Sequence, residues 1–277
     1  MARSGETAGI GIVGVGNLGA ALVAGWLRGD VGAQVDLALP LLVYDKDDAR
    51  IRGLVAQHGE RVRAVGSVVE MAGSADIILV AVKPQDLDDV MAAVGAAVGS
   101  GQSVVSTAAG AGLERLRASL GAGPDLYRIM PNLAVALGEG VVALAPEPGT
   151  DSGSIARVAA LFAGMGAVEV LPESLFDAVT AVTGSGPGFL ALVLEGLEDG
   201  AVRAGLPRAV ARRFVRQTAR GTAGLLLGDE GSAAALKDKV SSPGGTTIAG
   251  LAVLEDRGVR GALVRAVEAA TQRGREL

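Results

Sequence analysis

The stretch "IGIVGVGNLGAALVAGWLRG" at residues 10–29 constrains the fold of this chain more than any other. A β-like run over 10–15 leads into the pattern Gly14-x-Gly16-x-x-Gly19, and a helical segment follows. In this order the first glycine permits a tight turn, the second lets backbone approach a pyrophosphate, and the third allows close helix packing. The helix then presents the positive end of its dipole to the phosphates. The pattern predicts a dinucleotide-binding unit.

Further β-like runs alternate with helical segments and predict a parallel sheet of about eight strands with helices on both faces. They lie at 41–45, 77–82, 103–109, 126–130, 140–146 and 167–172. From Ser174 onward the strand signals stop, and 175–227 carries apolar residues at helical spacing. We therefore expect an α/β fold, with a Rossmann-type domain at 1–171 and an all-helical domain at 172–277. Because its helices are apolar with few charges, we expect the second domain to mediate dimerisation.

Composition limits the chemistry and the partners. The chain has 277 residues, no cysteine, one histidine (His58) and a net charge of −5. We therefore expect no thiol chemistry and no metal site, and a surface role for His58. The absence of a Lys/Arg-rich block argues against nucleic acid and anionic lipid, and favours a small-molecule ligand. The polar N-terminus and the shortness of the longest apolar run, 77–82, predict a cytoplasmic protein without a membrane span.

The end of the second strand bears on the choice of cofactor. Asp45 occupies the place of an acid that binds a ribose 2′-hydroxyl, which favours NADH. Lys46 and Arg50 are close enough along the chain to pair with a 2′-phosphate, which favours NADPH. Both cofactors therefore stay open.

Three further segments follow expected strands, where open α/β sheets bind ligands. "AVKPQ" at 81–85 predicts a turn near the nicotinamide ribose, although Lys83 could equally be a surface lysine. "STAAG" at 106–110 offers the small residues Ala108 and Ala109, and "RIMPN" at 128–132 borders the same expected cleft.

Two segments of the helical half combine small and hydroxyl residues. "TGSGPGF" at 183–189 predicts a helix entrance, which either packs closely against a neighbouring helix or lines the substrate site. "VSSPGGTT" at 240–247 predicts a turn and a helix that starts after Gly245. Free N–H groups and threonine hydroxyls at such a start suit a carboxylate.

These motifs, together with "KDKVSSPGGTT", resemble pyrroline-5-carboxylate reductases over the chain from about Ile10 to the C-terminal "RGREL". The resemblance implies a Rossmann domain, a helical domain that intertwines two subunits, and often a ring of such dimers. It also implies that the SPGGTT segment and the cofactor of one site come from different subunits.

The residues and the resemblance together predict two sets of contacts. The cofactor set comprises Val13, Gly14, Val15, Gly16, Asn17, Leu18, Gly19, Asp45, Lys46, Ser67, Ala81, Val82, Lys83, Pro84, Thr107, Ala108, Ala109, Asn132 and Lys239. The substrate set comprises Glu230, Ser242, Gly245, Thr246 and Thr247. We expect Thr247 to act in catalysis, with its hydroxyl near the imine nitrogen.

The activity that the resemblance implies is hydride transfer from NADPH or NADH to the C=N carbon of Δ1-pyrroline-5-carboxylate, which gives L-proline. "MPNLA" at 130–134 and "GPGF" at 186–189 depart from the family pattern, so a reductase of another cyclic imine carboxylate is an alternative. A non-catalytic dinucleotide sensor is a second alternative. A β-hydroxyacid dehydrogenase would need a lysine on the helix after "TGSGPGF", and 189–229 contains none.

Overall fold

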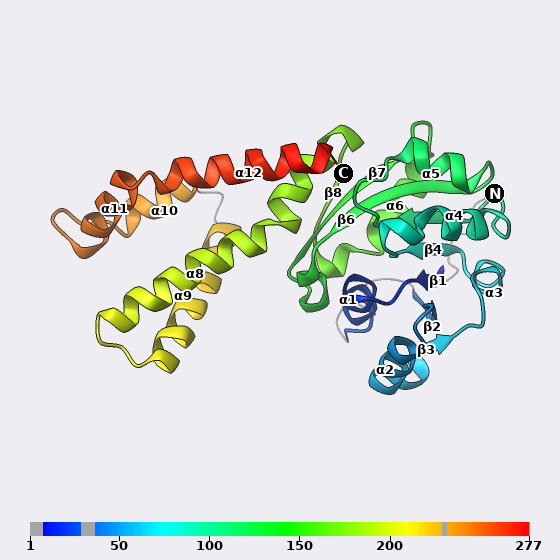
Figure 1. Ribbon diagram of the computed structural model, residues 1–277, viewed down its shortest axis with the longest axis horizontal. Helices are drawn as coiled ribbons and strands as arrows, with labels where there is room; N and C mark the ends of the chain where they lie inside the picture. Colours follow the sequence, from blue (N-terminus) through cyan, green and yellow to red (C-terminus); the bar gives the residue numbers. More distant parts are fainter. Residues whose placement is uncertain (1–7, 29–36, 229–231, 277) are drawn as a thin grey trace. The chain divides into compact units, whose positions relative to one another are not determined.

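The computed structural model describes residues 8–28, 37–228 and 232–276, which form two compact units (Figure 1). The sheet unit comprises residues up to Gly184 together with 271–277, and the helical unit comprises Ser185–Ala270. The expected boundary after residue 171 follows the last strand, whereas the compact sheet unit also includes the short helical turns up to Gly184. The domain limits of 171 and 172 stay a prediction.

The described residues of the sheet unit form one eight-stranded sheet, so the expected α/β class and the expected number of about eight strands are confirmed. Its spatial order is β3-β2-β1-β4-β5-β6-β7-β8, and all neighbouring strands are parallel except β6 and β7. The strands are β1 Ala8–Val13, β2 Leu37–Tyr44, β3 Val62–Ala64, β4 Ile77–Val80, β5 Ser103–Ser106, β6 Asp125–Pro131, β7 Gly140–Pro146 and β8 Gly166–Val170. Chain order reverses between β1 and β4, and open α/β sheets bind ligands at this kind of switch point.

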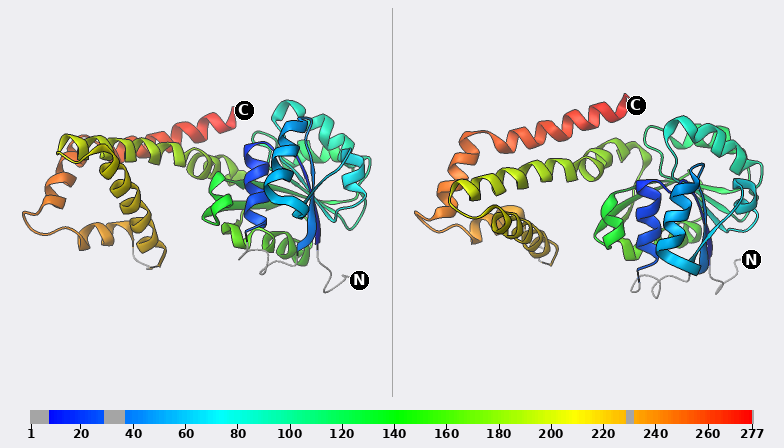
Figure 2. Two further views of the ribbon diagram at one scale, coloured as in Figure 1. Left: turned by 90° about the horizontal axis from the view of Figure 1, so that it is seen from below. Right: turned by 60° about the horizontal axis from the view of Figure 1, so that its bottom comes forward.

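Helices cover both faces of the sheet (Figure 2). They are α1 Asn17–Trp26, α2 Asp48–His58, α3 Val68–Ala72, α4 Leu87–Gly95, α5 Leu113–Leu120, α6 Ser152–Ala160 and α7 Phe176–Val179. Within β4, Ile77 and Leu79 join the core beneath α1, while Ile78 and Val80 join the core beneath α4 and α5. This alternation explains why the strand is apolar at every position. Trp26 closes the first core, and its Nε1 donates to the carbonyl oxygen of Leu161 at 2.8 Å.

The helical unit is formed by α8 Gly186–Arg203, α9 Arg208–Gly228, α10 Ala233–Lys239, α11 Thr246–Asp256 and most of α12 Val259–Arg275. Among the described residues of 185–270, only Glu198 and Ala211 are buried. Glu198 on α8 pairs with Arg216 on α9, with Nε and Oε1 3.3 Å apart. The larger apolar side chains lie on the surface of this unit, among them Leu190, Leu192, Leu197, Phe214, Leu225, Val253 and Val264.

One described helical stretch, Glu173–Arg203, is long and apolar enough to cross a bilayer by length and composition, with a mean hydropathy of 1.3 over its most apolar window. The expectation of no span rested on runs of consecutive apolar residues, which small and acidic residues interrupt here. Helices that pack in protein cores pass the same test, so this composition alone does not identify a membrane protein.

Candidate cofactor and substrate sites

The three glycines of the fingerprint have different surroundings. Gly14 has φ +94°, and a Cβ there would lie 2.5 Å from the carbonyl oxygen of Ala81. A Cβ on Gly19 would overlap the carbonyl oxygen of Gly14. A Cβ on Gly16 would meet only Arg50, with Nη1 at 3.5 Å. Gly14 and Gly19 are therefore required by packing, whereas Gly16 keeps the backbone accessible from the cleft.

Helix α1 begins at this accessible glycine. Gly16 is its N-cap, no side chain caps it, and no acidic residue lies in its first turn. The Ala20 N–H donates to the carbonyl oxygen of Gly16, which is the first hydrogen bond of the helix. The backbone N–H groups that precede Ala20 in the first turn therefore have no acceptor within the helix. A helix start of this kind suits an anion such as a pyrophosphate.

A cleft of about 830 Å³ lies above the carboxyl ends of β1, β2, β4 and β5. From the predicted cofactor set, the structure gathers in its lining Val13, Gly14, Gly16, Asn17, Leu18, Asp45, Lys46, Ala81, Val82, Lys83, Pro84, Thr107, Ala108 and Ala109. Gln85 of the predicted 81–85 turn and Arg50 also line the cleft. Sequence reasoning missed the lining residues Tyr44, Val68, Asp86, Asp89, Val90 and Ala93, of which the last three lie on α4. The cleft is large enough for a dinucleotide, and the uncapped start of α1 lines it. Each residue's contact with a cofactor stays a prediction.

Five predicted cofactor residues do not line the cleft. The Val15 N–H donates to Asp45, and Gly19 packs against Gly14. Ser67 caps α3, its Oγ accepting from the Glu70 N–H at 3.1 Å. Asn132 accepts from the Val141 N–H at 3.3 Å, and Lys239 ends α10 in the helical unit. In the described part of the chain these residues shape loops and helix ends.

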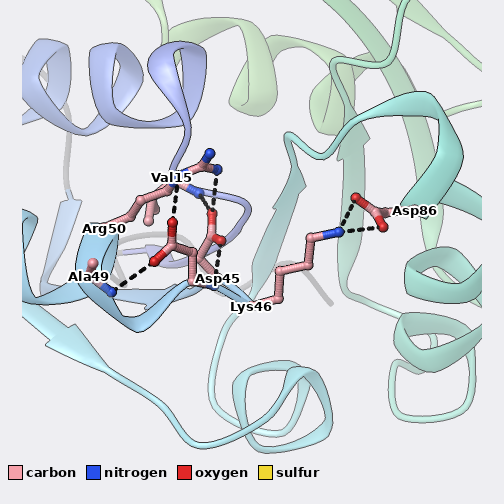
Figure 3. A network of polar contacts seen from close by, with 7 residues as sticks. Val15, Asp45, Lys46, Ala49, Arg50 and Asp86 are labelled. Atoms are coloured by element: carbon pink, nitrogen blue, oxygen red, sulfur yellow. Dashed lines mark hydrogen bonds and ion pairs between the residues drawn. The ribbon is translucent and has the colours of Figure 1, made fainter.

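Asp45 joins two loops at the end of β2 (Figure 3). Asp45 is 7% exposed, and its Oδ2 accepts from the Val15 N–H at 2.8 Å. Its Oδ1 accepts from the Asp47 N–H at 2.9 Å, and Arg50 Nη1 lies 3.6 Å from Oδ2. Asp45 thus holds the glycine loop against the end of β2, a role that its position in the sequence did not predict.

The ends of β4 and β5 form a floor of small side chains. The Thr107 N–H donates to the carbonyl oxygen of Val80 at 3.0 Å, and its Oγ1 donates to the same oxygen at 3.3 Å. The Ala108 N–H donates to Ser106 Oγ at 3.2 Å. The polar groups at this floor are therefore hydrogen-bonded within the protein. Ala108 and Ala109, whose side chains are single methyl groups, leave room in the cleft.

The segment 240–247 starts a helix as predicted. Gly244 has φ +69°, a conformation that favours glycine, and Gly245 is the N-cap of α11. No side chain caps α11 and no acidic residue lies in its first turn, so Thr246 and Thr247 stand at an uncapped helix start. Ser242 borders the turn through a hydrogen bond from the Gly245 N–H to its carbonyl oxygen, 3.0 Å. Glu230 lies outside the described residues.

The segment 183–189 also enters a helix as predicted. A π-helical turn, Thr180–Gly184, precedes α8, and π-helical turns are frequent at functional sites. His58 is half-buried, with both ring nitrogens buried and without a hydrogen-bond partner among the described residues, so it is less exposed than the expected surface role implies. Burial and, second, the charge of Arg61 lower the pKa of His58. The described ranges contain no group of residues suited to a metal ion.

The mostly parallel sheet, the uncapped helix start over Gly16 and the cleft above it define a dinucleotide-binding protein of the Rossmann class. Two family models agree with the two halves of the chain. One, described as NADP oxidoreductase coenzyme F420-dependent, matches residues 9–110. The other, described as pyrroline-5-carboxylate reductase dimerisation, matches residues 173–277.

Relatives and solved structures agree over nearly the whole chain. A pyrroline-5-carboxylate reductase of Synechocystis is 41% identical over 89% of this chain and 95% of its own length, and one of Escherichia coli is 34% identical over 97% of each. The pyrroline-5-carboxylate reductase structure from Coxiella burnetii superposes with a TM-score of 0.88 at 26% identity, covering 98% of each chain. A Plasmodium falciparum pyrroline carboxylate reductase with NADP bound has a TM-score of 0.83 at 26% identity, again over 98% of each chain. The chain belongs to the pyrroline-5-carboxylate reductase family.

Proposed function

We propose that this protein reduces Δ1-pyrroline-5-carboxylate to L-proline with NADPH or NADH, the final step of proline biosynthesis. The observation that carries the proposal is the cleft over Gly16 at the start of α1, in a chain that belongs to this family. When bound, the reduced nicotinamide supplies the hydride for the C=N carbon. The chain's own residues then have to hold the two reactants face to face.

The substrate carboxylate has a candidate site at the start of α11. The N–H groups after Gly245 and the hydroxyls of Ser242, Thr246 and Thr247 suit an anion, and no acidic residue in the first turn repels it. We assign the Thr247 hydroxyl to the imine nitrogen. Because the chain has no cysteine and its one histidine does not line the cleft, we assign no general acid, and the imine would react as its protonated iminium.

The first experiment mixes purified protein with Δ1-pyrroline-5-carboxylate and NADPH or, separately, NADH. We expect the near-ultraviolet absorbance of the reduced nicotinamide to fall only when imine and cofactor are both present, and L-proline to form. Tight nucleotide binding without turnover would support a dinucleotide sensor instead. One methylene changes binding by only about 1–3 kcal/mol, so the six-membered imine has to be compared directly. A higher specificity constant for the six-membered imine would identify a different cyclic imine reductase.

We further propose a dimer in which the 240–247 segment of one subunit serves the cofactor cleft of the other, and rings of such dimers. Mixing the impaired variants Gly16→Val and Thr247→Ala tests this arrangement. If one site draws on two subunits, mixed dimers regain one intact site, and the activity of the mixture rises above that of either variant alone. If each subunit builds its own site, the mixture shows no more activity than the average of the two variants. We propose a cytoplasmic location, with a small molecule as the only other partner.

A further inference from the structure

An ion pair joins the two loops that flank one end of the cofactor cleft. Lys46 follows β2, and Asp86 lies in the short helical turn Pro84–Asp86 that follows β4. The ammonium nitrogen of Lys46 lies 2.7 Å from Oδ1 and 2.8 Å from Oδ2 of Asp86 (Figure 3). Both residues line the cleft, although they are 40 positions apart in the sequence.

This ion pair lies where a Rossmann site distinguishes its cofactors. The residues at the end of β2 meet the adenosine ribose, where NAD carries a 2′-hydroxyl and NADP a 2′-phosphate. Two cations of the cleft lie there, and each already has acidic partners. Arg50 Nη1 lies 3.6 Å from Asp45 Oδ2, and Arg50 Nε lies 3.4 Å from Asp47 Oδ2. Lys46 pairs with Asp86. A 2′-phosphate therefore has to compete with carboxylates for both cations.

Asp86 has no evident structural task that would explain its position. It precedes α4, yet its side chain makes no cap hydrogen bond to that helix. Lys46 exposes 71% of its side chain and Asp86 29%, and an ion pair with one well-solvated partner contributes little to stability. The carboxylate matters more to a ligand, because a 2′-phosphate carries nearly two negative charges next to it.

We propose that Asp86 is a specificity-determining residue, which lowers the affinity for a 2′-phosphorylated cofactor relative to NAD(H) by holding Lys46 and by its own charge. The inference rests on the proposed function, since it requires a nicotinamide dinucleotide in this cleft. A ribose 2′-hydroxyl is uncharged, so Asp86 leaves NAD(H) largely unaffected. Asp86→Asn keeps the shape of the side chain and removes only its charge.

Calorimetric titration with 2′,5′-ADP and with 5′-AMP isolates this effect, because the two nucleotides differ only in the 2′-phosphate. Asp86→Asn should raise the affinity for 2′,5′-ADP roughly threefold to tenfold, as the loss of one exposed charge contact allows, and change that for 5′-AMP by less than about twofold. The same shift should be seen with NADP⁺ against NAD⁺. An unchanged ratio of affinities would overturn the proposal.

Asp88→Asn is the matched control. Asp88 lies in the first turn of α4 and pairs with Arg115 at 2.8 Å, but it does not line the cleft. Its neutralisation removes the same charge nearby and should leave the ratio unchanged. An equal rise in this control would assign the effect to net charge and overturn the role of Asp86.

Lys46→Met tests whether Asp86 acts through Lys46. In the Lys46→Met protein, Asp86→Asn should raise the affinity for 2′,5′-ADP much less than it does in the wild type, because Asp86 then holds no lysine that its loss could free for the 2′-phosphate. A full effect without Lys46 would contradict the holding of Lys46. If wild-type protein binds neither 5′-AMP nor NAD⁺, the cofactor site itself is wrong, and the proposed function fails together with this inference.

Discussion

Ile78 in the sheet unit is completely buried, whereas Leu192 in the helical unit exposes 71% of its surface, although both lie in strongly apolar segments. The sheet unit covers its apolar strands from both sides with its own helices. The helical unit leaves most of its leucines and valines uncovered within one chain. The comparison teaches that one half of this protein completes its core alone, while the other leaves an apolar surface that we expect a second copy of the chain to cover.

The largest expected effect comes from placing charge on the apolar surface of the helical unit. Leu192→Glu combined with Leu225→Glu should weaken self-association roughly a thousandfold, because each leucine loses about 1.5–3 kcal/mol of apolar burial. Sedimentation at several protein concentrations measures this change, and turnover should be lost with it. Glu195→Gln, an exposed position on α8, is the control and should leave the dimer intact. A dimer that survives the double substitution would break the comparison.

Shortening a leucine in the sheet unit should instead lower the stability of the fold. Leu22 is fully buried, so Leu22→Ala should lower the free energy of unfolding by about 2–5 kcal/mol. The single tryptophan, Trp26, lies in this core, so its fluorescence during denaturant unfolding reports on the sheet unit. Leu192→Ala should instead weaken association and leave the stability of the sheet unit unchanged. The denaturant concentration at which half of the Trp26 fluorescence change has occurred is called the Trp26 midpoint. If both alanine variants lower the Trp26 midpoint alike, the two units do not have separate cores.

Two glycines of one loop sharpen the comparison within the sheet unit. Gly16→Val should lower the affinity for NAD⁺ roughly a hundredfold, because its branched side chain enters the cleft where a pyrophosphate binds. Its Trp26 midpoint should stay close to that of the wild type. Gly19→Val should destabilise the sheet unit, because even a Cβ overlaps Gly14. Unchanged nucleotide affinity in Gly16→Val would remove the cleft from cofactor binding.

Thr247→Ala probes the helical unit with a smaller expected change. Loss of one hydroxyl near a charged imine should lower kcat/KM for the imine roughly tenfold to thirtyfold, which corresponds to about 1.5–2 kcal/mol, the lower part of the range for hydrogen bonds to charged groups. Calorimetry should show unchanged NAD⁺ affinity, and Thr247→Ser, which keeps the hydroxyl, should restore turnover. Equal losses of imine turnover and NAD⁺ affinity would contradict the assignment of Thr247 to substrate.

The smallest expected effect concerns pH. The folded-state pKa of His58 is lowered, mainly by burial, so the folded protein binds the proton less readily than the unfolded chain. Stability from this residue is therefore complete above its unfolded pKa of about 6.5 and is lost as pH falls through the lower folded value. The Trp26 midpoint should decline between about pH 7.5 and about pH 5.5 in the wild type, and less in His58→Gln. Identical declines would exclude His58 as their cause.

The sheet could be predicted because its strands are apolar and regularly spaced, and the glycine fingerprint fixed its first crossover. β3 was missed because it has three residues, of which only Val62 is buried. The helix start after Gly245 could be predicted because Pro and paired glycines mark a tight turn, whereas the absence of a side-chain cap is visible only in the structure.

The tertiary partners in the cleft could not be predicted. Nothing in the sequence connects Lys46 with Asp86, because their contact depends on how the turns after β2 and β4 approach each other. Asp45 carried the expected signal for a ribose ligand, yet its carboxylate also receives the Val15 and Asp47 N–H groups. Almost every residue type has a backbone N–H, so the sequence does not show which of these groups will donate to Asp45.

The order of the two units along the chain has a consequence for synthesis on the ribosome. The strands and helices up to Gly184 are translated first, so their core can form before the helical unit has emerged. Residues 185–277 need about 5 to 20 seconds more at ordinary elongation rates. The leucines and valines of the helical unit therefore emerge after the strands and helices up to Gly184, and residues 271–277 of the sheet unit emerge after them. Assembly then depends on how soon two finished chains meet, and hence on how many are made close together in the cell.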